Sequence, residues 1–172
     1  VAAEVAELKL DTATIAASLL HDTQEDCGVA TKELETRFGA EVAFLVEGVT
    51  KLSKVRYRGL QRKIESLRKM FLAVAQDVRV VLIKLADRLH NMQTIQFVRP
   101  DKQQRIAVET LEIYAPIAYR LGMGALKGTL EDLSFPIAHP EEYAWVKRES
   151  DRLVPEGERY LEEAVCPVLE EA

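Results

Sequence analysis

The sequence predicts an all-α fold, a multi-helix bundle of one domain, and three observations support it. Apolar residues recur three and four positions apart in most segments of the 172-residue chain, which is the spacing of one helix face. Residues that cap helices precede these segments, and glycines or prolines follow several of them. Hydrophobic residues make up 48% of the chain, enough at this length to bury a sizeable core.

The first half of the chain divides into five predicted helices. They cover residues 1–8, 11–25, 31–38, 41–52 and 62–75. Asp11 or Thr12 caps the second helix, which ends near residue 22 or 25, before Gly28. Thr31 caps the third helix and Gly39 ends it. The basic segment 53–59 is turn-like in composition, so we expect a loop there.

The second half begins with a helix that is apolar on nearly every side, which indicates a buried helix. Asp77 caps it. Residues 78–83 alone also suit a strand, but the continuation to Met92 favours one helix. A long helix follows over residues 101–121, and we expect a kink at Pro116.

The last part of the chain starts with a turn at Gly122 and Gly124, followed by a helix that ends near Ser134. Pro136 and Pro140 then set off the acidic segment 141–172, for which we expect one or two helices. Because the chain begins without methionine and already in helical periodicity, we expect it to be a fragment of a longer protein.

Composition excludes several classes of function. The net charge of −5 argues against nucleic acid as a direct ligand of this domain, although it permits a small phosphorylated one. No run of about 18 apolar residues occurs, so we expect no membrane span. The two cysteines, Cys27 and Cys166, lie far apart, which favours a reducing cytoplasm over a disulfide framework.

The run from His21 to Asp26 (His-Asp-Thr-Gln-Glu-Asp) is the most informative motif of the sequence. On a helix, His21 shares a face with Glu25, and Asp22 shares one with Asp26. No lysine or arginine lies between residues 19 and 30 to relieve this negative charge. A metal ion would neutralise the cluster.

Asp87 lies inside the buried helix, where a lone carboxylate costs several kcal/mol unless it is paired or binds a metal. Lys84 and Arg88 are near enough along the helix to form a purely structural ion pair with it. Together with His21 and Asp22, however, Asp87 completes a set of nitrogen and oxygen ligands that suits Mn, Mg, Fe or Zn. Both interpretations stand at this point.

Neighbours of Asp87 extend the same helix face. Asn91 and Thr94 are placed to hold a polar edge of a substrate, or to serve as a helix cap and a surface residue. His90 is either a further ligand or a side chain against the core. Glu25 and Asp26 remain free to deprotonate or orient a water molecule, which indicates hydrolysis, most simply of a phosphoryl group. Basic side chains that could bind its phosphates are Lys51, Lys54, Arg56, Arg58, Arg62, Lys63 and Arg105.

These motifs together resemble the hydrolase domain of Rel/SpoT enzymes, within the HD phosphohydrolase superfamily. The resemblance is carried by residues 18–26, 47–54, 67–73, 77–92, 109–122 and 130–135, and it extends to about residue 148. Members of this family use an all-helical bundle with Mn²⁺ to remove the 3′-pyrophosphate of ppGpp or pppGpp, which gives GDP or GTP.

The resemblance implies a role for each matched residue. His21, Asp22 and Asp87 would be metal ligands, while Glu25 and Asp26 would activate water at the 3′-phosphoryl group. Asn91 and Thr94 would contact the nucleotide, and Arg105 is a weaker candidate for phosphate binding. A further histidine ligand and a guanine-binding basic stretch would precede Val1. Residues 1–148 would form the hydrolase domain and residues 149–172 a connector towards a synthetase domain, in a cytoplasmic protein that binds ribosomes at full length.

Two rival functions remain beside the alarmone hydrolase. In one, the bundle is a regulatory module that binds nucleotide or restrains a synthetase without turnover. In the other, it hydrolyses a different nucleotide. The intact His-Asp-x-x-Glu-Asp run favours an enzyme, and the Rel/SpoT motifs outside the metal site favour the alarmone.

Overall fold

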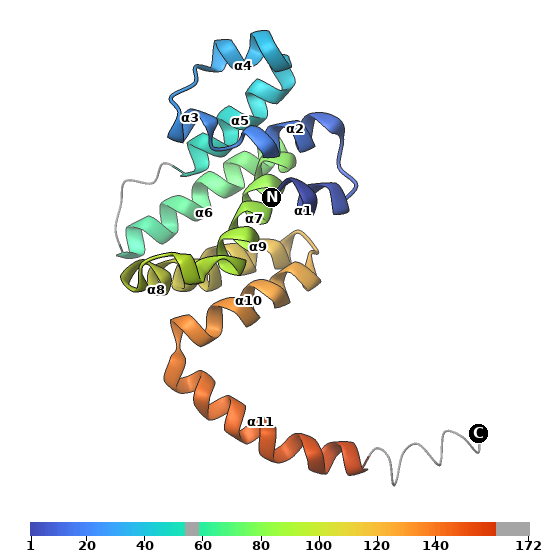
Figure 1. Cartoon of the computed structure of the whole chain (residues 1–172), viewed down its shortest axis with the longest axis vertical. Coiled ribbons are helices and arrows are strands. Elements are labelled where there is room, and N and C mark those ends of the chain that lie inside the picture. The colour runs from blue at the N-terminus through green and yellow to red at the C-terminus, as the bar shows by residue number, and fades with distance from the viewer. Residues whose placement is uncertain (54–58, 161–172) are drawn as a thin grey trace, which may run out of the picture.

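The structure, a computed structural model, describes residues 1–53 and 59–160, with side chains outside 54–63 and 155–160, and these residues form a helical bundle without strands (Figure 1). The helices are α1 (Ala2–Glu7), α2 (Thr12–Leu20), α3 (Thr23–Asp26), α4 (Thr31–Phe38), α5 (Ala40–Ser53), α6 (Gly59–Gln76), α7 (Val78–Gln93), α8 (Pro100–Glu109), α9 (Ala115–Arg120), α10 (Gly124–Ala138) and α11 (Pro140–Tyr160). A 3₁₀ turn, η1 (Ile95–Phe97), follows α7, and a π-helical turn, η2 (Thr110–Tyr114), follows α8. The predicted all-α bundle is confirmed.

Helix α7 forms the centre of the bundle. Ten of its sixteen residues are buried, and it contacts α1, α2, α5, α6 and α10 (Figure 1). As predicted, Asp77 caps its first turn, with Oδ1 accepting a bond from the backbone amide of Arg79 at 2.9 Å. The alternative strand over residues 78–83 is thereby excluded, since this segment lies in the helix.

Gly48 allows α5 and α7 to approach closely. A Cβ atom at this position would lie 2.8 Å from Cγ2 of Val80, which is shorter than a van der Waals contact. The predicted helix of residues 41–52 is confirmed with one further residue at each end, and the predicted 62–75 helix is the inner part of α6. The loop predicted for 53–59 falls largely outside the described residues.

Of the two ends predicted for the second helix, the one near residue 22 agrees with α2, whereas continuation to residue 25 is wrong, because a separate helix, α3, begins after His21 and Asp22. Two side chains donate hydrogen bonds to backbone carbonyls in the last turn of α2. The Thr23 hydroxyl donates to the Leu20 carbonyl at 2.6 Å, and His21 Nδ1 donates to the Ser18 carbonyl at 2.8 Å. Such side-chain bonds compete with the helical ladder and end the helix.

Two other boundaries of the prediction also change. The N-cap of α4 is Ala30 rather than Thr31, whose hydroxyl instead accepts a bond from Gln24 Nε2 at 2.9 Å. Helix α10 continues through Pro136 to Ala138 and does not end near Ser134. Only one backbone bond is lost, since the proline lies in the last turn and its restricted φ suits a helix.

The irregularity expected at Pro116 is present, but it begins before the proline. The chain over residues 110–114 widens into a π turn, in which the Ala115 amide bonds to the Thr110 carbonyl. Gly122 has a φ of 76°, which suits the predicted turn into α10. The final helix, α11, packs on α10 and then leaves the bundle (Figure 1).

Candidate metal centre

Asp87 lies near the middle of α7 and is 5% exposed. Its two oxygen atoms have different partners. Oδ2 accepts a bond from Lys84 Nζ at 2.7 Å, while Oδ1 accepts one from Asn91 Nδ2 at 2.9 Å. The predicted ion pair with Lys84 is therefore present. Arg88, the other partner considered, turns away, with its guanidinium 4.0 Å from the Tyr114 ring and 3.2 Å from Glu109 Oε2.

His21 lies between the ends of α2 and α3, with its ring directed at α7. Nδ1 is fixed by the Ser18 carbonyl at 2.8 Å, and because a carbonyl only accepts, Nδ1 carries the proton. In the neutral ring, Nε2 then offers a lone pair. This atom is buried and has no hydrogen-bond partner of good geometry.

The ring nitrogen Nε2 of His21 faces two carboxylates. It lies 2.9 Å from Asp22 Oδ2 and 3.5 Å from Asp87 Oδ1. One ligand atom from each of the three residues lies within 4.8 Å of the others. The structure thus brings together the three residues that the sequence singles out as metal ligands, from positions 66 residues apart.

The electrostatics of the cluster call for a positive charge between these atoms. Burial raises the pKa of Asp87, but the nearby His21 ring and the bond from Lys84 outweigh it and hold that pKa well below its usual range. The Asp87 carboxylate, 3.5 Å from Nε2, raises the pKa of His21 against its partial burial. Partial burial raises the pKa of Asp22. Three lone-pair atoms repel one another unless a proton or a metal ion joins them.

A divalent metal ion fits this donor set. One imidazole nitrogen and two carboxylate oxygens are ligands that Mn²⁺, Fe²⁺ and Zn²⁺ accept, and the Ser18 carbonyl holds the ring in the required tautomer. Asp22 is the most open ligand, with 54% of its side chain exposed, so the cluster faces solvent on that side. Asn91 orients Asp87, Lys84 balances the charge of that carboxylate, and Ser18 orients His21.

The other residues predicted for the site lie outside this three-residue group. Glu25 and Asp26 are exposed on α3, where Asp22 is the N-cap, and the Asp26 amide bonds to the Asp22 carbonyl at 2.8 Å. Neither carboxylate belongs to the three-residue group. Asn91 contacts Asp87 directly, so it is not the helix cap considered as an alternative.

Two predicted contacts with the substrate are placed at the end of α7 and beyond it. Thr94 is the C-cap of α7, and its hydroxyl donates to the His90 carbonyl at 2.9 Å. His90 itself is exposed and is not part of the cluster. Arg105 is exposed on α8. Lys54, Arg56, Arg58, Arg62 and Lys63, considered as phosphate ligands, lie outside the side chains that the structure describes, whereas Lys51 is exposed and pairs with Glu47 at 2.6 Å.

Sequence reasoning missed the positioning role of Ser18, and it took Lys84 only as an alternative to the metal. Ser18 acts through its backbone carbonyl, which any residue type would offer, so no sequence signal exists for it. Lys84 gives such a signal, because a lysine in an otherwise apolar helix needs a buried anion. In the structure, Asp87 belongs both to the ion pair with Lys84 and to the three-residue group with His21 and Asp22.

Comparison with known proteins places the chain in a family. The HD domain family matches residues 1–124. Guanosine-3′,5′-bis(diphosphate) 3′-pyrophosphohydrolase of Haemophilus influenzae is 52% identical over 149 residues, which cover 86% of this chain and 22% of that protein. The chain is an HD-domain member of the Rel/SpoT family.

Two further relatives carry different names within the Rel/SpoT family. The bifunctional (p)ppGpp synthase/hydrolase SpoT of Escherichia coli K12 is 51% identical over 148 residues, covering 86% of this chain and 21% of that protein. GTP pyrophosphokinase of Myxococcus xanthus is 48% identical over 173 residues, covering 98% of this chain and 23% of that protein. The chain spans about a fifth of the length of these relatives.

No helix among the described residues is long and apolar enough to cross a membrane. Cys27 is an exposed free thiol, and Cys166 lies outside the described residues.

Proposed function

We propose that this chain is a metal-dependent hydrolase domain that removes the 3′-pyrophosphate of ppGpp and pppGpp, with GDP or GTP and pyrophosphate as products. The observation that carries the proposal is the convergence of His21 Nε2 with Asp22 and Asp87 oxygens within 4.8 Å. The names of the Haemophilus and Escherichia relatives support the substrate. We also propose Mn²⁺ as the metal, because the resemblance to Rel/SpoT hydrolase domains implies it and the nitrogen and oxygen donors of the cluster accept it.

Each site residue has a proposed role that follows from its place. His21, Asp22 and Asp87 would hold the metal, which lowers the pKa of water and polarises a phosphoryl oxygen when it is bound. Glu25 and Asp26 are exposed beside the most open ligand, Asp22, where they can accept a proton from the attacking water.

The nucleotide would extend from the metal along α7. The Asn91 amide has a second N–H and an oxygen available beyond its bond to Asp87, and Thr94 follows one turn later. We propose that both contact the nucleotide and that Arg105 binds a phosphate group. Residues 1–148 would form the hydrolase domain and residues 149–172 a connector. The proposed boundary lies within α11 (Pro140–Tyr160), which packs on α10 and then leaves the bundle (Figure 1). Ribosome binding at full length and a cytoplasmic location stay predictions.

The experiment is pyrophosphate release from ppGpp with Mn²⁺, using the chain alone and a form extended upstream to include the histidine that the resemblance implies. Glu25→Gln should slow release by about 10²–10⁴-fold, the range for loss of a general base. Glu33→Gln is the matched control, because Glu33 is equally exposed and pairs only with Arg37 on α4 among the described contacts. An unchanged rate for Glu25→Gln would refute its role.

A second candidate function is a nucleotide-binding regulatory module. The relative named GTP pyrophosphokinase, at 48% identity, favours keeping it, since that name describes synthesis rather than hydrolysis. Binding of metal and ppGpp by the extended form without any release of pyrophosphate would support the module and refute the hydrolase.

A further inference from the structure

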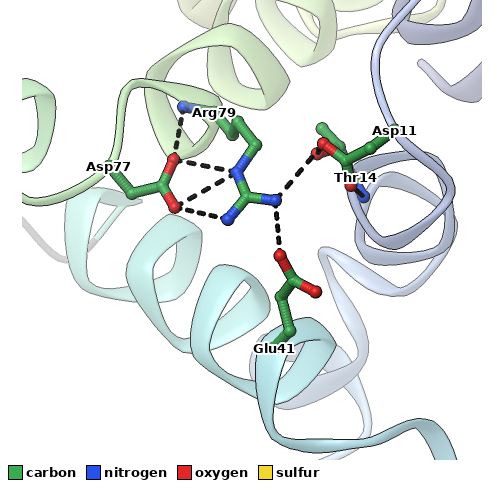
Figure 2. A network of polar contacts seen from close by, with 5 residues as sticks. All are labelled: Asp11, Thr14, Glu41, Asp77 and Arg79. Carbon is green, nitrogen blue, oxygen red and sulfur yellow. Dashed lines mark hydrogen bonds and ion pairs between the residues drawn. The ribbon is translucent and has the colours of Figure 1, made fainter.

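A network of ion pairs lies at the N-terminal ends of α2 and α7, away from the candidate metal centre, which involves the end of α2 and the middle of α7. Its centre is Arg79, in the first turn of α7 (Figure 2). The guanidinium contacts three carboxylates, which belong to Asp11, Glu41 and Asp77. One cation thus joins three anions, and these come from the N-terminal ends of three different helices.

Every contact of the network is made at a helix N-terminus. Asp77 is the N-cap of α7 and binds Arg79 through Nε at 3.1 Å and Nη2 at 2.7 Å. Nη1 reaches Glu41 in the first turn of α5 at 2.7 Å, and Asp11, the N-cap of α2, at 3.2 Å. Asp11 in turn caps α2 by accepting bonds from the amide and hydroxyl of Thr14. Figure 2 shows that each of the three guanidinium nitrogens of Arg79 contacts at least one carboxylate.

The same two helices carry the metal ligands. His21 directly follows α2, ten residues after Asp11, or about 15 Å along a helix. Asp87 lies eight residues after Arg79 on α7, or about 12 Å. Helix α2 is therefore joined to α7 near both of its own ends. Arg79 joins their N-termini, and the cluster of His21 and Asp87 joins them where α2 ends.

We infer that Arg79 is a positioning residue for the metal centre. It sets the position of α2 along α7, and so the separation of His21 Nε2 from Asp87 Oδ1, which is 3.5 Å. Without Arg79, α2 would still pack on α5, but its N-cap would lose its tie to α7. This inference rests on the proposed metal-dependent function, because it concerns the geometry of the same ligands.

The test measures Mn²⁺ affinity of the 172-residue chain without nucleotide, at a temperature where circular dichroism shows every variant folded. Mutation of residues that support metal ligands usually weakens metal binding 10- to 100-fold, and we expect about tenfold for Arg79→Gln because it acts through a helix. Arg79→Lys should lose less Mn²⁺ affinity, since lysine keeps the positive charge but not the planar guanidinium group that contacts several carboxylates at once. The matched control is Arg99→Gln, an exposed arginine paired with Asp101 away from these helices.

Two further variants separate positioning from a general loss of stability. Asp11→Asn keeps the N-cap of α2 but weakens its contact with Arg79, so it should lower Mn²⁺ affinity. Asp77→Asn weakens a contact that lies wholly within α7, so it should change stability but leave the affinity within about twofold. An equal loss of Mn²⁺ affinity in Asp11→Asn and Asp77→Asn would overturn the inference. A Mn²⁺ affinity of Arg79→Gln equal to that of Arg99→Gln would also overturn it.

Hydrogen exchange in the metal-free chain provides a readout that does not depend on metal binding. Arg79→Gln should speed exchange of the backbone amides in α2, relative to those in α10, by lowering the free energy of local opening. Unchanged exchange in α2 would overturn the inference. Failure of the proposed hydrolase is a separate result, in which the predicted order of affinities and exchange rates holds but ppGpp is not hydrolysed.

Discussion

Replacing Lys84 by methionine tests whether the buried charges around Asp87 are balanced as described. Lys84 and Asp87 are 8% and 5% exposed, and their charged atoms lie 2.7 Å apart. Methionine retains an unbranched side chain of similar length but removes the ammonium. The variant therefore leaves a buried carboxylate without its cation, while the packing of α7 changes little.

The expected cost follows from what remains around Asp87. Breaking a buried ion pair usually costs 3–5 kcal/mol. Asn91 still donates to Oδ1 at 2.9 Å, and His21 lies 3.5 Å away with a raised pKa, so both still stabilise the carboxylate. We therefore expect the lower end of the range, about 3 kcal/mol, in the metal-free protein.

Urea unfolding with and without Mn²⁺ measures this cost. Lys84 repels a cation held by the same carboxylate, so Lys84→Met should bind Mn²⁺ more tightly, and saturating metal should reduce the loss of stability. Lys127→Met, which breaks a half-buried pair with Glu131, is the control and should cost less than about 1 kcal/mol. A metal-free loss below that of the control would refute the reasoning, as would a loss that metal increases.

Two other predictions concern packing and acid stability. Gly48→Ala should destabilise the protein by about 1–2 kcal/mol in urea unfolding, because overpacking against Val80 outweighs the better helix propensity of alanine. The same substitution in a Val80→Ala background should not carry this cost. A stabilising effect of Gly48→Ala would contradict the close approach of α5 and α7. Stability should also fall between about pH 4 and pH 2, because the pKa of Asp11 drops from 3.8 to about 2 on folding, chiefly through the Thr14 hydroxyl. This contribution is complete above pH 4 and lost as the pH falls through 2. Thr14→Val should raise the pKa of Asp11, which NMR titration of its carboxyl carbon would detect, and an unchanged titration would contradict the assignment.

Local sequence signals predicted much of the fold. The apolar periodicity of residues 78–92 and the cap at Asp77 gave α7, because both depend on neighbours in the chain. Gly39 and Gly122 marked helix ends, since both need a positive φ that other residues adopt at a cost. The grouping of His21, Asp22 and Asp87 was also predictable, because no lysine or arginine lies near His21 and Asp22 in the sequence and because Asp87 lies in a helix that is apolar on nearly every side.

The remainder depends on contacts that the sequence does not encode locally. The break between α2 and α3 comes from side chains that bond to backbone carbonyls, and helix propensity alone favours continuation through His21. Two of the three partners of Arg79 lie 38 and 68 residues away at the starts of other helices, so its role became visible only in the folded chain. The π turn before Pro116 likewise adds a residue to a turn that sequence periodicity treats as regular.

The most direct test of the central claim is pyrophosphate release from ppGpp as a function of Mn²⁺ concentration, for the upstream-extended wild type and for Asp87→Asn. We expect release by the wild type to rise with Mn²⁺ and saturate, and Asp87→Asn to lose both Mn²⁺ binding and release, since it removes a ligand oxygen at the cluster. Wild-type release that is independent of Mn²⁺, or full release by Asp87→Asn, would contradict a metal-dependent hydrolase built on His21, Asp22 and Asp87.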